Sequence, residues 1–305
     1  MSLKEQIKKI IEPIFNIRNK SYLEKYYKAI DTNENIYNID DDFSKLKRVL
    51  VLAPHQDDET IGLGATISKM KSYGIIVDLI YLTDGRINGD NTNISEIRIQ
   101  EANKMKEILA IDNMYVIDNI NDTLEEKIDY TSEFMINNLK LDEYDAYFFT
   151  SRFDCHKDHR STFDVLVNLC KNNKLKKDSI FYMYDINNSI QGDILNCISM
   201  IKNKELSDKW KAYEVFKSQK YITFSTIKII DNKKIGIAKN KGIDISNFEG
   251  LECFCRINLE QLINISKIDN SFAKEMNTAT SSIKLKKFLE ENKNYRNNFK
   301  NIQSL

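Results

Sequence analysis

The sequence alternates short apolar runs with helix-like stretches through its centre, and this alternation most constrains the fold. The first run, RVLVLA, is apolar on both faces, as a central strand of a parallel sheet would be. The predicted strands cover residues 48–53, 75–85, 113–118, 145–151 and 179–185. The pattern predicts an α/β fold with a Rossmann-like, doubly wound and mostly parallel sheet.

A sheet of this type fixes which strands are neighbours. With the strand order 3-2-1-4-5, the first and fourth predicted strands lie side by side. The order reverses between them, and ligands of such sheets bind at the carboxyl ends of the strands at that point. We therefore expect residues 54–60 and 152–160 to meet.

The chain contains three histidines, and all three follow these two strands. His55 comes after the first strand, and His156 and His159 come after the fourth. The same two segments carry the acids Asp57, Asp58, Glu59, Asp154 and Asp158. Nitrogen and carboxylate ligands favour a borderline cation such as Zn²⁺, although the non-haem Fe²⁺ triad uses the same ligand types.

Each motif has an ordinary structural explanation when taken alone. The acids after His55 could begin a helix, where the dipole favours negative charge. The pair His156 and His159 could lie in the core or on the surface. Together, at two strand ends and with no histidine elsewhere, the motifs predict a metal site in which one acid binds the ion while its neighbour handles protons.

Composition excludes several other classes of protein. Lys+Arg and Asp+Glu both number 45, so the net charge is zero and nothing points to nucleic acid. The five cysteines are odd in number and form no CxxC pair, which argues against a disulfide framework and favours a reducing cytoplasm. No apolar run is long enough to predict a transmembrane helix.

The two ends of the chain look like additions to the central unit. We expect a helical extension over 1–47, a catalytic domain over 48–260 with a C-terminal α+β elaboration, and a helical tail over 261–305. Pro13 must start, kink or split the first helix. Because this helix is basic and amphipathic, two hypotheses remain: it packs on the main domain, or it associates weakly with a membrane surface.

Two motifs resemble those of the PIG-L/LmbE-like deacetylases. APHQDDETIGLGATI (53–67) resembles the opening motif of that family, and DCHKDHR (154–160) resembles its second motif. Weaker similarities are LTDGR (82–86), RIQEA (98–102), KAYEVFKSQ (211–219) and GLECF (250–254). Gln56 and Lys157 stand where proline is common in the family, and Ala65 replaces a frequent glycine.

The resemblance implies a zinc-dependent hydrolase that removes the N-acetyl group from an amino-sugar conjugate of the N-acetylglucosamine type. It would release acetate and a free amine. The implied metal ligands are His55, Asp58 and His159. Asp57 would be the general base, and a protonated His156, oriented by Asp158, would stabilise the oxyanion or protonate the leaving amine.

Other assignments remain open from sequence. Arg86 and Arg98 are candidates for binding substrate hydroxyls or a phosphate, although Arg98 could instead pair with Glu96 or Glu101. Selectivity is expected in 85–96, 119–122 and 186–250. The alternative functions are an amidase on another small amide or a thiol–sugar conjugate, and a non-catalytic glycan-binding protein. The sequence does not define an oligomeric state.

Overall fold

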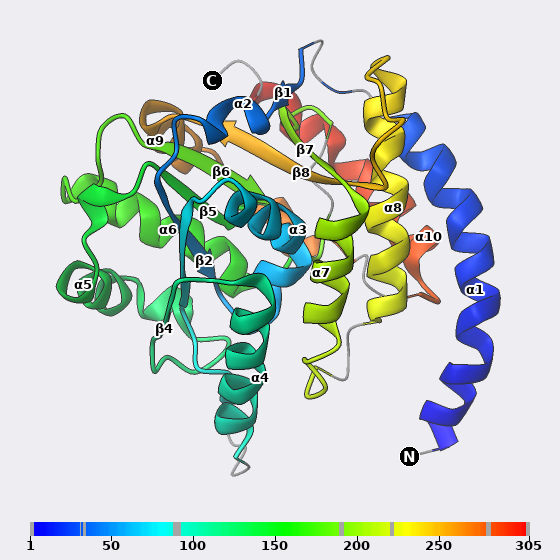
Figure 1. Ribbon diagram of the computed structural model, residues 1–305, viewed down its shortest axis with the longest axis horizontal. Coiled ribbons are helices and arrows are strands. Elements are labelled where there is room, and N and C mark those ends of the chain that lie inside the picture. The colour runs from blue at the N-terminus through cyan, green and yellow to red at the C-terminus, as the bar shows by residue number, and fades with distance from the viewer. Residues whose placement is uncertain are drawn as a thin grey trace.

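The computed structural model describes residues 3–30, 32, 35–87, 93–188, 192–219, 223–278 and 282–302. These residues form a sheet with helices on both faces (Figure 1). The predicted α/β fold, with a mostly parallel sheet and a helical N-terminus, is confirmed.

The described residues form one eight-stranded sheet with the order β1-β7-β8-β6-β5-β2-β3-β4. Its strands are β1 (Tyr37–Asn38), β2 (Arg48–Ala53), β3 (Ile76–Tyr81), β4 (Asn113–Val116), β5 (Ala146–Thr150), β6 (Ile180–Tyr184), β7 (Cys197–Ile201) and β8 (Gly250–Ile257).

The α-helices of the described residues are α1 (Leu3–Lys28), α2 (Asp40–Phe43), α3 (Asp58–Ser72), α4 (Ile94–Leu109), α5 (Ile128–Asn138), α6 (Lys157–Lys171), α7 (Asn203–Tyr213), α8 (Phe224–Asn240), α9 (Leu259–Ser266) and α10 (Leu285–Asn292). Short 3-10 helices cover Leu124–Glu126, Leu141–Glu143, Ser271–Glu275 and Lys293–Ile302.

The central strand β2 pairs in parallel with β3 on one side and with β5 on the other. Val49 is in register with Val77 and with Ala146. The predicted order of the five strands appears as β4-β3-β2-β5-β6, so this prediction is confirmed. The C-terminal elaboration extends the sheet through β8, which is antiparallel to both β6 and β7.

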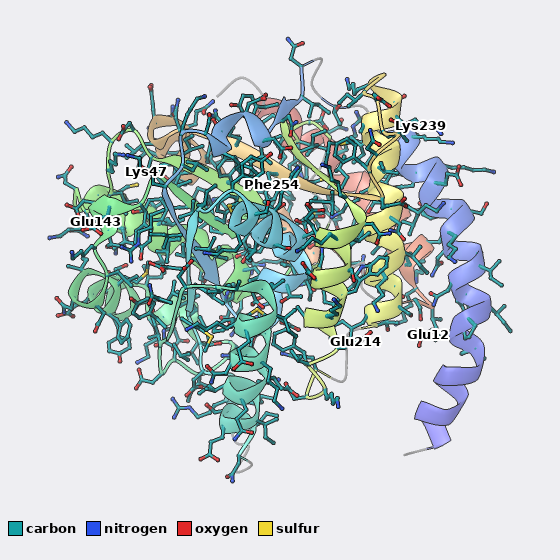
Figure 2. All side chains as sticks on the ribbon, viewed as in Figure 1. Glu12, Lys47, Glu143, Glu214, Lys239 and Phe254 are labelled. Carbon is teal, nitrogen blue, oxygen red and sulfur yellow. The ribbon has the colours of Figure 1, made fainter. Side chains whose placement is uncertain are left out.

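The sheet separates two hydrophobic cores, because successive side chains of a strand point to opposite faces. Leu50 and Leu52 lie in the core covered by α1, α5, α6, α8, α9 and α10. Val49 and Val51 lie in the core covered by α2, α3, α4 and α7. Phe254 of β8 is buried within the crowded centre of the molecule, whereas the charged residues labelled with it lie around the edge (Figure 2).

The structure differs from what the sequence pattern predicts in four elements. The sequence predicts one helix over 207–219, but the helix there, α7, ends at Tyr213. The sequence also predicts one helix over 123–140, which in the structure divides into a 3-10 turn and α5. Strand β7 and helix α8 were not predicted. Buried polar residues interrupt the apolar pattern of both elements, namely Ser199 in β7 and Asp231 and Lys234 in α8.

Helix α1 continues through Pro13 and lies along α8 (Figure 1). Asn16 Nδ2 donates to Ser225 Oγ at 3.0 Å, and Asn19 Nδ2 donates to the Ser282 carbonyl at 2.7 Å. These bonds join α1 to α8 and to the C-terminal tail. In the part of the chain that the structure describes, no helix is both long and apolar enough to cross a membrane.

Helix α3, which begins inside the first motif, is kinked at Leu63, where φ is −148° and ψ is 20°. Gly62 lies against the Tyr184 ring, and a Cβ there would come within 2.2 Å of Cδ2. In an unbroken helix the Ala65 amide would bond the Ile61 carbonyl. At the kink, Glu252 of β8 accepts that amide at 3.1 Å instead.

The carbonyl released by the kink is bonded by a buried lysine. Lys209 Nζ donates to the Ile61 carbonyl at 2.9 Å, to Asp231 at 2.9 Å and to Glu252 at 2.7 Å. Glu252 also accepts the amide of Thr66 at 2.7 Å. The Lys209–Glu252 pair therefore replaces the helical hydrogen bond that the kink removes, and it fixes α3 to α7 and β8.

Replacing this lysine should destabilise the protein strongly. Lys209→Met leaves two buried carboxylates without their cation, so we expect the free energy of unfolding to fall by about 3–5 kcal/mol. The matched control Lys211→Met removes a lysine whose side chain is 64% exposed, and should cost less than about 1 kcal/mol. Urea denaturation measures both, and equal midpoints would contradict this account of the kink.

Candidate metal centre

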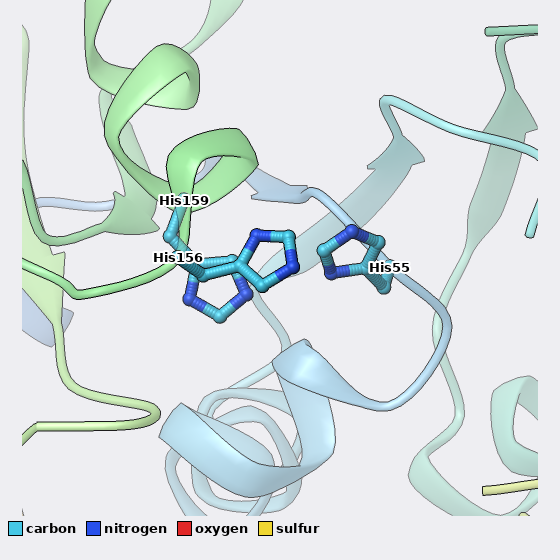
Figure 3. A group of neighbouring side chains, drawn as sticks. All are labelled: His55, His156 and His159. Carbon is cyan, nitrogen blue, oxygen red and sulfur yellow. The ribbon is translucent and has the colours of Figure 1, made fainter. Parts of the chain in front are cut away.

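The three histidines meet at the carboxyl edge of the sheet, although about 100 residues separate the two motifs. His55 follows β2, while His156 and His159 lie at the start of α6, with His156 as its N-cap (Figure 3). One ring nitrogen from each lies within 4.8 Å of the others. The predicted convergence of the two segments is therefore present in the structure.

Asp58 lies between two of these histidines. Its Oδ2 is 3.2 Å from His55 Nδ1 and 3.3 Å from His159 Nε2. The same oxygen accepts the backbone N–H of His55 at 2.9 Å. Ligands about 2.0–2.1 Å from a tetrahedral zinc ion lie about 3.3–3.4 Å apart. The two distances from Asp58 Oδ2 to the histidine nitrogens match this spacing.

The far nitrogen of each of these two rings faces another carboxylate. His55 Nε2 is 3.0 Å from Asp158 Oδ2, and His159 Nδ1 is 3.2 Å from Asp154 Oδ1. Metal-binding histidines commonly donate their second N–H to such a carboxylate, which sets the tautomer and the ring orientation. Asp158 therefore directs His55 Nδ1 toward Asp58, and Asp154 directs His159 Nε2 toward it.

The acids make this buried site attractive to positive charge. Burial lowers the pKa of His55, but the facing Asp158 and Asp58 carboxylates outweigh it and raise that pKa to about 9. Burial opposes the charged form of His159 too, yet Asp58 and Asp154 raise its pKa well above the ordinary value. The negative charge of these carboxylates that favours protonation of the two rings would also attract a divalent metal ion.

Asp57 has a strained backbone and an unpaired carboxylate oxygen. Its φ is 131°, a left-handed value that costs a non-glycine residue about 1–3 kcal/mol. The side chain is 2% exposed, and its Oδ2 has no hydrogen-bond partner among the described residues. Burial, with the charges of Asp58 and Glu59, raises its pKa well above the ordinary value. An orphaned, buried oxygen beside the His–Asp cluster fits a metal centre that handles a bound water or substrate group.

His156 has a different environment from the other two histidines. The backbone N–H of Asp158 donates to its Nδ1 at 3.2 Å, so Nδ1 is an acceptor and the proton of the neutral ring lies on Nε2. Nε2 is 3.5 Å from Asp122 Oδ1. Burial, then His159 and His55, lower its pKa to about 3. The structure thus indicates a neutral His156, in contrast to the protonated form expected from sequence.

Asp158 touches His156 differently from the expectation. Its carboxylate bonds His55 Nε2, and it also accepts the backbone amides of Asp122 at 2.6 Å and Leu124 at 3.2 Å. The hydrogen bond between Asp158 and His156 comes instead from the Asp158 backbone N–H. Asp158 therefore orients His156 through its amide and His55 through its side chain.

The two arginines predicted to bind substrate are both engaged within the protein. Arg86 pairs with Asp84 at 2.5 Å and has a side chain that is 46% exposed. Arg98 is buried and donates from Nη1 to the Gly85 carbonyl at 3.0 Å, while its Nε has no partner among the described residues. The predicted selectivity loop 85–96 includes 88–92, which lie outside the described residues.

Segments with weaker similarity to the family form hydrogen bonds with one another and with the first motif. Glu101, a possible partner of Arg98, instead accepts the backbone N–H and the hydroxyl of Ser218 at 2.9 and 2.6 Å. Gln219 Nε2 donates to the Gln56 carbonyl at 2.9 Å, and Gln56 Nε2 donates to the Thr83 carbonyl at 2.8 Å. The hydrogen bonds of Gln56 thus anchor the loop after β2, at a position where the family often has proline.

Sequence reasoning missed Asp122, Asn187 and Asn188. Asn187 Nδ2 donates to Asp154 Oδ1 at 3.1 Å and lies 3.4 Å from His159 Nδ1. Asn187 and Asn188 lie in the loop that follows β6, after Asp185 and Ile186. Their place at the carboxyl end of a strand next to β5 is the signal that could have found them.

The doubly wound sheet and the His–Asp cluster at its carboxyl edge define an α/β protein with a candidate catalytic metal centre. Residues 50–170 match the family model described as PIG-L: GlcNAc-PI de-N-acetylase. The resemblance carried by the two motifs to this family is therefore confirmed over residues 50–170.

One curated relative is the diacetylchitobiose deacetylase of Thermococcus kodakarensis. It is 36% identical over 87 residues, which are 27% of this chain and 33% of that protein. The chain thus matches about a third of the length of this relative.

Solved structures share the fold. N,N'-diacetylchitobiose deacetylase from Pyrococcus horikoshii aligns with a TM-score of 0.54 and 19% identity over 85% of this chain and 94% of that one. A conserved protein from Thermus thermophilus aligns with a TM-score of 0.53 and 18% identity over 68% of this chain and 92% of that one. At these identities the likeness concerns the fold.

Substitution of single histidines should separate metal ligands from their neighbours. His159→Ala removes a nitrogen that faces Asp58, and should weaken zinc binding by more than the ~10–100-fold typical for the loss of an outer partner. His156→Ala is the matched control, and should bind zinc within about 10-fold of the parent. Titration of the metal-free protein with Zn²⁺ measures both. Equal losses would favour a site made from all three histidines.

Proposed function

We propose that the protein is a zinc-dependent N-deacetylase that removes acetyl from an amino-sugar conjugate of the N-acetylglucosamine type. The products are acetate and a free amine. The observation that carries this proposal is the buried, unpaired carboxylate oxygen of Asp57 beside the His–Asp cluster of a PIG-L-family domain. A protein that only binds a glycan has no need to keep a strained proton acceptor there.

His55, Asp58 and His159 are the proposed ligands of the metal ion. Two imidazoles and one carboxylate are typical of catalytic zinc sites that leave a position open, and Fe²⁺ uses the same ligand types. A divalent ion held there polarises an amide carbonyl and acidifies water. Asp154 and Asp158 keep the two rings in the orientation that this ligand set requires.

Asp57 takes the role of general base. Its free oxygen accepts a proton from the water that attacks the acetyl carbonyl. Because His156 Nδ1 already accepts the Asp158 amide, we assign the return of this proton to Asp57 as well, which delivers it to the departing amine nitrogen. One carboxyl group therefore serves first as base and then as acid.

His156 takes the role of hydrogen-bond donor to the developing oxyanion. Its neutral ring has the proton on Nε2, the nitrogen that lies 3.5 Å from the exposed carboxylate of Asp122. A neutral imidazole can donate such a bond without moving its proton to the substrate. Stabilisation of this kind is often the largest single contribution to catalysis.

The choice of an N-acetylated sugar as substrate follows the relatives. The curated match in Thermococcus kodakarensis is a diacetylchitobiose deacetylase, and the family model is described by a GlcNAc-containing substrate. We further propose that 48–260 is the catalytic domain, that 1–47 and 261–305 are helical additions to it, and that the enzyme works in the cytoplasm. The free state of all five cysteines fits a reducing compartment.

Acetate release from a panel of N-acetylglucosaminides tests the reaction. We expect the zinc-loaded parent to release acetate, and Asp57→Asn to lower kcat by about 10²–10⁴-fold, because the proton acceptor is lost. His156→Ala should lower kcat by about 10²–10³-fold, the usual effect of losing one oxyanion donor.

Metal content supplies the control for this experiment, since neither residue is a proposed ligand and both variants should keep their zinc. Unchanged kcat in Asp57→Asn would overturn the mechanism. Zinc binding by the parent without acetate from any sugar would favour another small amide, a thiol–sugar conjugate or a glycan-binding role.

A further inference from the structure

Two consecutive asparagines after β6 connect the metal centre to the C-terminal tail. Asn187 bonds both oxygens of Asp154, from its backbone N–H to Oδ2 at 3.0 Å and from Nδ2 to Oδ1 at 3.1 Å. Its own Oδ1 accepts the Thr278 hydroxyl at 3.1 Å. The two ends of one amide group thus contact the site loop and the tail. Because an ionised carboxylate only accepts hydrogen bonds, Asp154 fixes which end of the amide faces it.

Asn188 repeats this connection one residue further along. Its Oδ1 accepts the backbone N–H of Cys155 at 2.8 Å, and its Nδ2 donates to the Asn277 carbonyl at 2.6 Å. The side chain is 4% exposed. Neighbouring residues of the β6 loop therefore bond neighbouring residues of the site loop, Asp154 and Cys155, and of the tail.

The tail residue that receives Asn188 is itself held in place. Asn292, at the end of α10, accepts the backbone N–H of Asn277 at 2.8 Å and donates to its carbonyl at 2.8 Å. The β6 loop is anchored at its start by Asp185, whose carboxylate bonds the buried Lys234 of α8 at 2.9 and 3.0 Å. Further hydrogen bonds thus hold both the tail and the β6 loop in place.

The connection reaches His159 through Asp154. This carboxylate is 1% exposed and contacts four donors, the backbone amides of His156 and Asn187, Asn187 Nδ2 and His159 Nδ1. A carboxylate fixed by so many bonds holds the proton of His159 on Nδ1 and leaves Nε2 directed at Asp58. The position of His159 therefore depends on Asn187.

We propose that the C-terminal tail supports the metal centre through Asn277, Thr278 and Asn292, and that Asn187, Asn188 and Thr278 are positioning residues for His159. The proposal rests on the ligand assignment of the proposed function. All of these positioning residues lie beyond residues 50–170, the stretch that matches the family model. This chain therefore completes its metal centre with residues outside the matched stretch.

Zinc affinity measured on the metal-free full-length protein, by titration against a competing chelator, tests the proposal. Asn187→Leu should weaken zinc binding about 10–100-fold, the usual cost of losing an outer partner of a metal ligand. Thr278→Val should weaken it less, because Asp154 keeps its bonds from Asn187. Ser282→Ala is the matched control on the same tail, since its buried hydroxyl has no hydrogen-bond partner among the described residues.

A double variant adds a readout that a merely structural role would not move. If Thr278 acts through Asn187, then Asn187→Leu with Thr278→Val should bind zinc no more weakly than Asn187→Leu alone. If Asn187→Leu does not fold, the zinc affinity of Thr278→Val compared with that of Ser282→Ala still tests the proposal. Zinc affinities equal to the parent in both Asn187→Leu and Thr278→Val would overturn the proposal and leave the proposed function intact. Absence of zinc binding by the parent would overturn both, whereas zinc binding without deacetylation would overturn the function alone.

Discussion

The parallel pairing of β2 with β5 is the interaction on which the rest of the site depends. It aligns Val49 with Ala146 and Val51 with Phe148, so the two strands end together at one edge of the sheet. The chain reaches that edge twice, each time with histidine and acid. Because the crossover order reverses between these strands, the helices that follow them leave in opposite directions and open the space in which ligands of such sheets bind. The candidate metal centre therefore depends first on the topology of the sheet and second on the chemistry of its residues.

Three consecutive acids are tolerated because each has a different environment. Asp58 faces His55 and His159, whose positive charge stabilises the carboxylate and holds its pKa well below the ordinary range, against the effect of burial. Glu59 is buried beside Thr60, whose hydroxyl donates to it at 2.7 Å, and burial raises its pKa to about 7. One oxygen of Asp57 has no hydrogen-bond partner within the described part of the chain. Under the proposed function, the stretch thus places a metal-binding carboxylate, Asp58, directly after a proton-transferring one, Asp57, whose backbone is strained.

The sequence was sufficient where local pattern and topology agree. The five alternating strands and their order followed from periodicity, and the meeting of His55 with His159 followed from that order. The partners of these histidines could not be derived, because they depend on distances that no pattern records. The sequence predicts that Asp158 orients His156, whereas its carboxylate contacts His55. Asn187 lies in the loop after β6, and its contact with the site can be recognised only when β6 is known to pair with β5. The buried Lys209 was hidden for the same reason, since its partners come from β8 and α8.

The most direct test of this account is the location of a bound metal ion, by anomalous diffraction at the zinc edge from crystals of the zinc-loaded protein. We predict one strong peak that lies about 2.0–2.2 Å from His55 Nδ1, from a carboxylate oxygen of Asp58 and from His159 Nε2, with Asp57 and His156 beside the ion but outside its ligand set. A peak coordinated by His156 together with Asp122 or Asp158, or no peak at the edge of the sheet, would contradict it.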